Sequence, residues 1–165
     1  MAADHRKRGK RLLARNRLNE AFEHLNRAFE MDPSHLPNRL NIGVCCYHLG
    51  QLDDAIQHFR YVLSFEPKNP DALLNIGAAW NQKEDYGSAL EILKRLVDTH
   101  HDFPDSHYNL AIVHIGLGDY KSAFTQLSEE LRRDPKHKQA QKVAYQLIEL
   151  HEKGEKMREK SNDVE

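Results

Sequence analysis

Residues 43–67, GVCCYHLGQLDDAIQHFRYVLSFEP, decide the fold of this 165-residue chain. Apolar residues recur at helical spacing up to Leu49, Gly50 then interrupts the pattern, and a second apolar run ends at Pro67. Glycine suits the left-handed cap at the end of a helix, and proline cannot continue a helix interior. The stretch therefore predicts two amphipathic helices that are joined by a tight turn.

The same pattern returns along the chain every 34 residues, without insertion or deletion. A small residue allows the two helices of one repeat to approach closely, and a large apolar residue fills the space beside it. No single repeat can bury its apolar face alone, so neighbouring repeats must stack into one continuous core. Four columns carry the pattern: Gly9, Gly43, Gly77 and Ala111; Leu18, Leu52, Tyr86 and Tyr120; Ala21, Ala55, Ala89 and Ala123; and Leu25, Phe59, Leu93 and Leu127.

The repeat sets the predicted domain boundaries. Prolines close three repeats at Pro33, Pro67 and Pro135, whereas the third repeat has His101 in that place and a later Pro104. An apolar stripe that includes Ala140, Val143, Ala144, Leu147 and Ile148 then predicts a final helix that covers the fourth repeat. The predicted domains are residues 1–137 with four repeats (2–35, 36–69, 70–103 and 104–137), a capping helix over 138–153 and a charged tail over 154–165.

These columns resemble the tetratricopeptide repeat family, and the resemblance covers residues 2–137. It implies an all-α fold, a right-handed superhelical solenoid of four helix–turn–helix units with a C-terminal capping helix. The first helix departs from the pattern, because His5 and Arg8 stand where apolar residues are expected. The matching residues are Gly43, Cys46, Gly50, Leu52, Ala55, Phe59, Val62, Pro67, Trp80, Ala89, Gly118, Tyr120, Ala123 and Pro135.

The composition excludes several classes of protein. Apolar residues make up 39% of the chain and charged residues 30%, with a net charge of −1, which is typical of a water-soluble folded protein. No apolar run approaches the roughly 20 residues that span a bilayer, and the basic N-terminus lacks the apolar middle of a secretory signal. We therefore expect a cytoplasmic protein without membrane insertion. The adjacent Cys45 and Cys46 are expected to be buried as small hydrophobic residues rather than paired in a disulfide.

The histidines offer the best case for metal or catalytic chemistry. His100, His101 and His107 lie near Asp102 and Asp105 at a predicted turn between repeats. Zinc sites need three or four convergent ligands at a defined spacing, and no paired cysteines or second ligand motif accompany this cluster. No phosphate-binding loop or nucleophile motif is present either. We therefore predict no catalytic residue, no metal and no cofactor, and the protein is not expected to be an enzyme.

The exposed face of the first helix in each repeat indicates a binding groove. Asn41, Asn75 and Asn109 occupy the same place in three successive repeats, and Lys7 takes that place in the first repeat. An asparagine amide can pair with both the C=O and the N–H of an extended backbone. The asparagines predict a groove for an extended or helical partner segment, although they could instead satisfy loop carbonyls inside the solenoid. Apolar residues accompany them at Leu40, Val44, Tyr47, Leu74, Tyr108 and Ile112.

This asparagine column is similar to the one in the repeats of O-linked N-acetylglucosamine transferase, but no transferase domain is present here. Residues 1–17 carry seven basic side chains and one acidic one, and Arg6, Lys7 and Lys10 lie at one end of the predicted groove. A bound segment should therefore place an acidic portion toward the first repeat.

The sequence thus favours a non-enzymatic adaptor that binds a protein or peptide segment in the concave groove. A structural scaffold that self-assembles through its poorly covered first repeat is the main alternative. Nucleic-acid binding by the basic N-terminal helix is less favoured, because no aromatic residue for base stacking occurs in residues 1–21.

Overall fold

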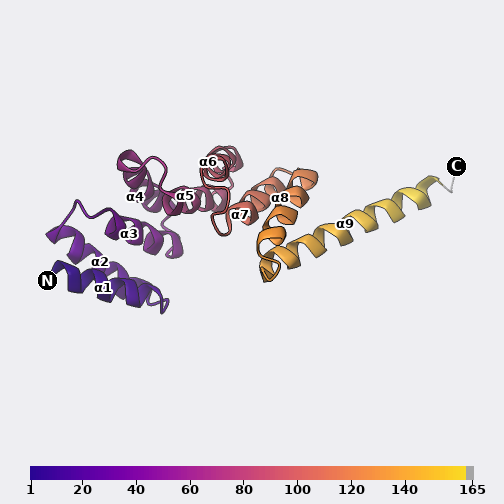
Figure 1. The fold of residues 1–165 in the computed structure, drawn as a ribbon. Coiled ribbons are helices and arrows are strands. Elements are labelled where there is room, and N and C mark those ends of the chain that lie inside the picture. Colours follow the sequence, from indigo (N-terminus) through magenta and orange to yellow (C-terminus); the bar gives the residue numbers. More distant parts are fainter. Residues whose placement is uncertain (163–165) are drawn as a thin grey trace. The chain divides into compact units, whose positions relative to one another are not determined.

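The structure is a computed structural model that describes residues 1–162, with side chains described up to residue 153. Within this range the chain is entirely helical, with no strand, which confirms the predicted all-α fold (Figure 1). No helix of the described range is long and apolar enough to cross a membrane. The helices are α1 (Ala2–Leu13), α2 (Leu18–Met31), α3 (Leu36–His48), α4 (Leu52–Phe65), α5 (Pro70–Gln82), α6 (Tyr86–Thr99), α7 (Ser106–Gly116), α8 (Tyr120–Arg133) and α9 (Lys138–Asn162).

The helices pack in consecutive pairs, as the repeat predicts. Helix α1 packs on α2, α3 on α4, α5 on α6 and α7 on α8, while α2 contacts α3, α4 contacts α5 and α8 contacts α9. The first helices of neighbouring repeats also touch, α1 with α3 and α3 with α5. The chain forms two compact parts, an N-terminal part (Met1–His101) and a C-terminal part (Asp102–Glu165).

The small-residue column has the steric role that the sequence predicts. A Cβ added at Gly9 or at Gly77 would lie 2.6 Å from a side-chain atom of Leu25 or Leu93, respectively. Such a distance is far below van der Waals contact, so only glycine fits at these two crossings. The helices of the first and third repeats therefore pack closely at these crossings.

The turn inside each repeat is also built as predicted. Four residues at the same place in successive repeats have a positive φ: Asn16 (56°), Gly50 (78°), Glu84 (61°) and Gly118 (74°). This left-handed conformation ends the first helix of each repeat. Glycine adopts it without steric cost and asparagine tolerates it better than most residues, whereas Glu84 adopts it against its intrinsic preference.

The core runs between the helix pairs of the N-terminal part, where Leu25, Ile42 and Phe59 are fully buried. Cys45 and Cys46 belong to this core and form no disulfide, as expected. Burial raises the pKa of Cys45 to about 12 and that of Cys46 to about 11, so both thiols stay protonated at neutral pH.

In the C-terminal part, α9 covers the outer side of the fourth repeat. Ala111, Leu127 and Ala140 are fully buried together, and Val143, Ala144 and Leu147 pack against them. Most of the apolar stripe that the sequence places on the final helix therefore packs on the fourth repeat, whereas Ile148 stays 41% exposed.

Helix α7 begins at Ser106, later in its repeat than α3 and α5 begin in theirs. Its N-cap residue Asp105 has a φ of 59° and makes no side-chain capping bond. Instead, Tyr108 N donates a hydrogen bond at 3.0 Å to Oε2 of Glu130, a side chain that is only 4% exposed. The other repeats have Ala28, Val62 and Leu96 at the place of Glu130. The fourth repeat thus replaces a core residue with a carboxylate that caps the shortened helix.

Candidate peptide-binding groove

The structure places two of the three predicted asparagines on neighbouring helices. Asn41 lies on α3 and Asn75 on α5, both are partly exposed, and these two helices contact each other in the N-terminal part. Asn109 is also partly exposed and lies on α7 of the C-terminal part.

Two of the asparagine amides are held in place by their own helix. Nδ2 of Asn75 donates to the carbonyl oxygen of Asp71 at 2.7 Å, and Nδ2 of Asn109 donates to that of Asp105 at 2.9 Å. Each bond uses one of the two amide protons, so the second proton and Oδ1 face no described partner. Both amides are therefore fixed in orientation and still have a donor and an acceptor for a ligand.

The apolar residues beside the asparagines are shared between the core and the surface. Leu40, Val44 and Tyr47 are partly buried and pack against the core of the N-terminal part, and Leu74 on α5 is partly buried as well. Burial raises the pKa of the Tyr47 hydroxyl. These residues can offer a ligand part of their apolar surface without leaving the core.

On α7 of the C-terminal part, Tyr108 and Ile112 are likewise partly buried. The Tyr108 ring lies 5.0 Å from the ring of His137, centroid to centroid, and burial raises the pKa of its hydroxyl. Tyr108 therefore belongs partly to the contact between the fourth repeat and the start of α9.

The three predicted cations differ in their surroundings. Arg6 donates through Nη1 to Oδ2 of Asp32 at 2.9 Å, and its side chain is only 23% exposed. The hydrogen bond from Ser34, together with Arg6, lowers the pKa of the Asp32 carboxyl. Lys7 and Lys10 are exposed and form no ion pair with any residue that the structure describes. The charge available to a partner at this end is therefore that of the two lysines.

One structural feature of the N-terminal part has no signal in the repeat pattern. The guanidinium carbon of Arg39 lies 3.5 Å from the centroid of the Tyr61 ring and 5.0 Å from that of Phe29. Such cation–π contacts stabilise the junction of the first two repeats. The buried Asn38 adds a hydrogen bond from its Nδ2 to the Leu25 carbonyl oxygen at 2.9 Å. The third repeat has the apolar Leu73 and Ala72 in the places of Arg39 and Asn38, so the family pattern alone does not single out these two polar residues.

A group of possible metal ligands occurs in the C-terminal part. The hydrogen bonds of its histidine, His137, already determine which ring nitrogen carries the proton. The donor atoms of Asp105, Glu130 and His137 lie within 4.8 Å of one another. Nδ1 of His137 accepts a hydrogen bond from Ala140 N at 3.0 Å, so the neutral ring carries its proton on Nε2, which donates to Oδ1 of Asp105 at 2.7 Å. A metal would need the Nε2 lone pair and could bind only if His137 ceased to cap α9. The cluster is therefore a capping arrangement.

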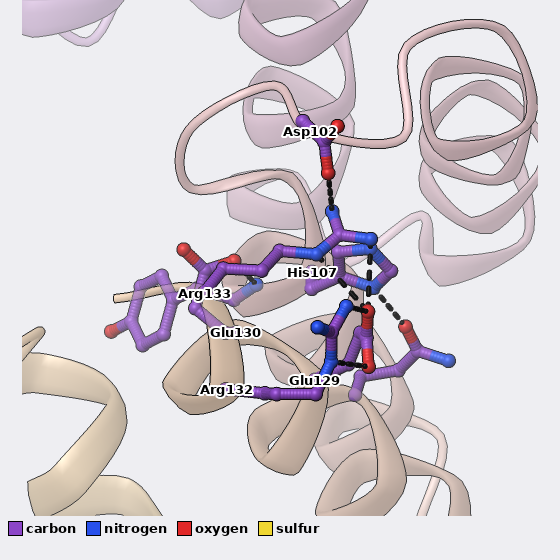
Figure 2. Close-up of polar contacts among 8 residues, drawn as sticks. Asp102, His107, Glu129, Glu130, Arg132 and Arg133 are labelled. Atoms are coloured by element: carbon purple, nitrogen blue, oxygen red, sulfur yellow. Dashed lines mark hydrogen bonds and ion pairs between the residues drawn. The ribbon is translucent and has the colours of Figure 1, made fainter. Parts of the chain in front are cut away.

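Two of the histidines near the predicted turn, His100 and His107, each pair with a side chain of their own part of the chain. His107 is buried on α7 and pairs through Nδ1 with Oε1 of Gln126 at 2.7 Å (Figure 2). His100 belongs to the N-terminal part, where its Nδ1 lies 2.9 Å from Oγ1 of Thr99.

Figure 2 also shows a charged network at the end of α8. Arg132 and Arg133 both donate to the carboxylate of Glu129, at 2.7 Å and 2.9 Å for their closest ion-pair contacts, and Arg133 Nη1 lies 3.8 Å from Oδ1 of Asp102. The two guanidinium groups lower the pKa of Glu129 to about 2. These charges neutralise one another and tie the loop before α7 to α8.

Solved structures share this fold at low sequence identity. MamA (41-end) from Desulfovibrio magneticus RS-1 matches with a TM-score of 0.79 and 19% identity, over 99% of this chain and 92% of that one. A chain of the APC/C hetero-tetramer Cut9–Hcn1 matches with a TM-score of 0.83 and 18% identity, over 90% of this chain and 30% of that one. YrrB, described as a TPR protein with an unusual peptide-binding site, matches with a TM-score of 0.69 and 20% identity, over 92% of this chain and 78% of that one.

At these identities the likeness shows the fold alone. No curated protein sequence matches this chain. The sequence pattern of the tetratricopeptide repeat, however, matches three overlapping ranges, residues 12–58, 50–105 and 81–147, which together cover most of the chain. The chain therefore belongs to the tetratricopeptide repeat family.

Proposed function

We propose that this protein is a non-enzymatic adaptor that binds an extended or helical segment of a partner protein in a groove on its first helices. The groove is formed by the exposed faces of α1, α3 and α5, and α7 presents the corresponding residues. The observation that carries the proposal is the pair Asn41 and Asn75, partly exposed on two helices that touch.

The asparagines suit recognition of a polypeptide backbone. Because Asn75 is already bonded to Asp71 and Asn109 to Asp105, ordering these amides on binding costs little side-chain entropy. The remaining N–H and Oδ1 of each amide can pair with a carbonyl and an N–H of the ligand without reading its side chains. The partly exposed Leu40, Val44 and Leu74 add apolar contacts beside these hydrogen bonds.

The charges give the bound segment a direction. Lys7 and Lys10 are exposed on α1, whereas Asp71 on α5 is an exposed acid. A segment with an acidic portion is favoured when that portion lies beside α1, and the opposite orientation brings like charges together.

The proposal of a non-enzymatic role is supported by the state of the candidate catalytic groups. Both thiols are buried with raised pKa values, and His107 and His137 are engaged in hydrogen bonds inside the protein. YrrB, a protein of the same fold, is described as having a peptide-binding site.

An array of extended peptides with and without acidic ends, followed by isothermal titration of those that bind, tests the proposal. Replacing Asn41, Asn75 and Asn109 together by alanine should weaken binding by about tenfold or more, because ligand backbone groups lose their partners. The double variant Asn19→Ala/Gln57→Ala, which removes exposed amides from α2 and α4, is the matched control and should bind normally. Unchanged affinity of the triple variant would place the partner on another surface.

A further inference from the structure

Helix α9 begins a fifth copy of the repeat pattern that is not completed within the described residues. In this copy Tyr145 takes the place that Ala111 has in the fourth repeat, in the column of Gly9, Gly43 and Gly77. Ile148 likewise takes the place of the buried His114. In the first four repeats, this face of the first helix is covered by the second helix of the same repeat. On α9 it is open, with Tyr145 70% exposed and Ile148 41% exposed.

Tyr145 prevents a second helix from packing on this face of α9 as it does in the first four repeats. At Gly43, even one added Cβ would lie 2.6 Å from the ring that covers it. A phenol ring in this column therefore excludes a second helix at the normal spacing of a repeat. Whatever covers this face must leave room for the Tyr145 ring.

The open face borders an apolar groove between α8 and α9. Two adjoining pockets, with volumes of about 450 and 370 Å³, share Phe124 and Ile148 as lining residues. Tyr120 and Phe124 line the α8 side and are 49% and 43% exposed. Among the residues that line the two pockets, only Lys121 carries a permanent charge, so covering the groove removes little charge from water.

We infer that this groove is the contact surface for a second copy of the chain, which docks tail to tail through α8 and α9. Each copy carries both a protruding ring, Tyr145, and a hollow beside Phe124 and Ile148. A two-fold axis between two copies can place each Tyr145 ring in the hollow of the other, so the same residues serve on both sides of the contact.

The exposed aromatic rings supply about half of the area that such a contact needs. Because aromatic side chains cover about 200 Å² each, Tyr120, Phe124 and Tyr145 expose about 300 Å² per copy. Two copies can therefore hide about 600 Å² of aromatic surface, about half of the roughly 1,200 Å² at the lower end of specific interfaces. The aliphatic walls of the groove, including Leu131, Leu147 and Ile148, add to this area.

The first repeat is poorly suited to the same role. Its exposed Arg8 and Arg11 stand at the places where the second repeat has the buried core residues Ile42 and Cys45. Stacking an apolar surface on α1 would remove both guanidinium groups from water without a partner. Self-association through the first repeat, the alternative that the sequence suggested, is therefore less favourable than association through α8 and α9.

Sedimentation equilibrium of the full chain over a wide concentration range tests this inference. We expect the wild-type mass to rise from one copy to two and then to stop, because a two-fold contact closes on itself. Tyr145→Glu and Phe124→Glu should each weaken the dimer by about tenfold or more. Phe65→Glu is the matched control, because Phe65 is 62% exposed on α4 of the N-terminal part, and it should leave the dimer unchanged.

Circular dichroism should show that Tyr145→Glu keeps the wild-type helicity, since its side chain is mostly exposed. A wild-type chain that stays monomeric, a dimer that withstands both groove variants, or a mass that keeps growing beyond two copies would each overturn the inference. Peptide binding by the asparagine groove should be the same for Tyr145→Glu and wild type, so this inference and the proposed function can fail independently.

Discussion

The Phe59 ring fills the space that a side chain on Gly43 would need, with Cε1 only 2.6 Å from the position of an added Cβ. The ring cannot retreat easily, because Phe59 is fully buried between the repeats. Gly43→Ala should therefore destabilise the protein, because overpacking costs about 1–3 kcal/mol. Alanine regains roughly 1 kcal/mol of this cost, since it is a better helix former than glycine. Urea unfolding followed by circular dichroism measures the difference.

Gly87→Ala is the control for this prediction. The nearest atom to an added Cβ there is Oδ1 of Asp85 at 3.7 Å, an ordinary contact, so this variant should be as stable as wild type or slightly more stable. Equal stability of Gly43→Ala and Gly87→Ala would show that the small-residue column is not a steric requirement.

A second prediction concerns the left-handed turn inside the third repeat. Glu84 has a φ of 61°, which an L-residue adopts at a cost of about 1 kcal/mol, whereas Gly50 and Gly118 adopt it freely. Glu84→Gly should therefore raise the free energy of unfolding by about 0.5–1 kcal/mol. Glu84→Ala is the control, because it removes the same charge but keeps the Cβ, and it should bring no such gain.

The sequence was sufficient for these turns and for the helix pairs, because both depend on residues at fixed places in the repeat. The late start of α7 could not be predicted in this way. Pro104 fits the first position of a helix as well as Pro70 does. The actual start depends on Glu130, which lies on α8 and reaches back to Tyr108 N.

The candidate site was predictable only in part for the same reason. The partly exposed positions of Asn41, Asn75 and Asn109 follow from helical periodicity, which says nothing about side-chain partners. The ion pair between Arg6 and Asp32 joins the two ends of the first repeat and depends on how α1 crosses α2. Tyr145, in contrast, stands out in the sequence once the glycine column is extended to the final helix.

A third prediction is a pH dependence of stability through His58. Burial, and then the nearby positive charge of Arg39, lower the pKa of His58 below its usual value of 6.5. The unfolded chain therefore binds the proton more tightly than the folded chain, and stability must fall as the pH drops below about 6.5. His58→Gln removes the titrating group. When the pH is lowered from 8 to 5.5, the free energy of unfolding should therefore fall more for the wild type than for this variant.

Urea titrations of both proteins across this range measure that difference. The other histidines contribute equally to the pH dependence of both proteins, so their effects cancel in the comparison. His24, whose pKa is also lowered by burial and by Arg8, is present in both proteins. A stability difference that stays constant from pH 8 to pH 5.5 would mean that His58 takes up its proton equally well in the folded chain.

The last prediction concerns the charged end of the groove. Lys7 and Lys10 are exposed without an ion pair among the described residues, so either can attract the acidic portion of a partner segment from a distance. Lys7→Glu and Lys10→Glu should each slow the association of an acidic peptide chosen from the array. Salt screens exposed charges over about 10 Å at 0.1 M, so the slowing should be large at low salt and small at high salt.

Stopped-flow fluorescence with that peptide measures the association rate, and Arg15→Glu is the matched control. Arg15 is also an exposed cation, but it lies in the turn after α1, beyond the end of the helix that carries Lys7 and Lys10. Arg15→Glu should therefore slow association less than Lys7→Glu does. If the two variants slow it equally, and a generic oligonucleotide binds more tightly than any peptide, the basic helix attracts polyanions as a whole. Binding of nucleic acid would then explain its charge better than a peptide groove does.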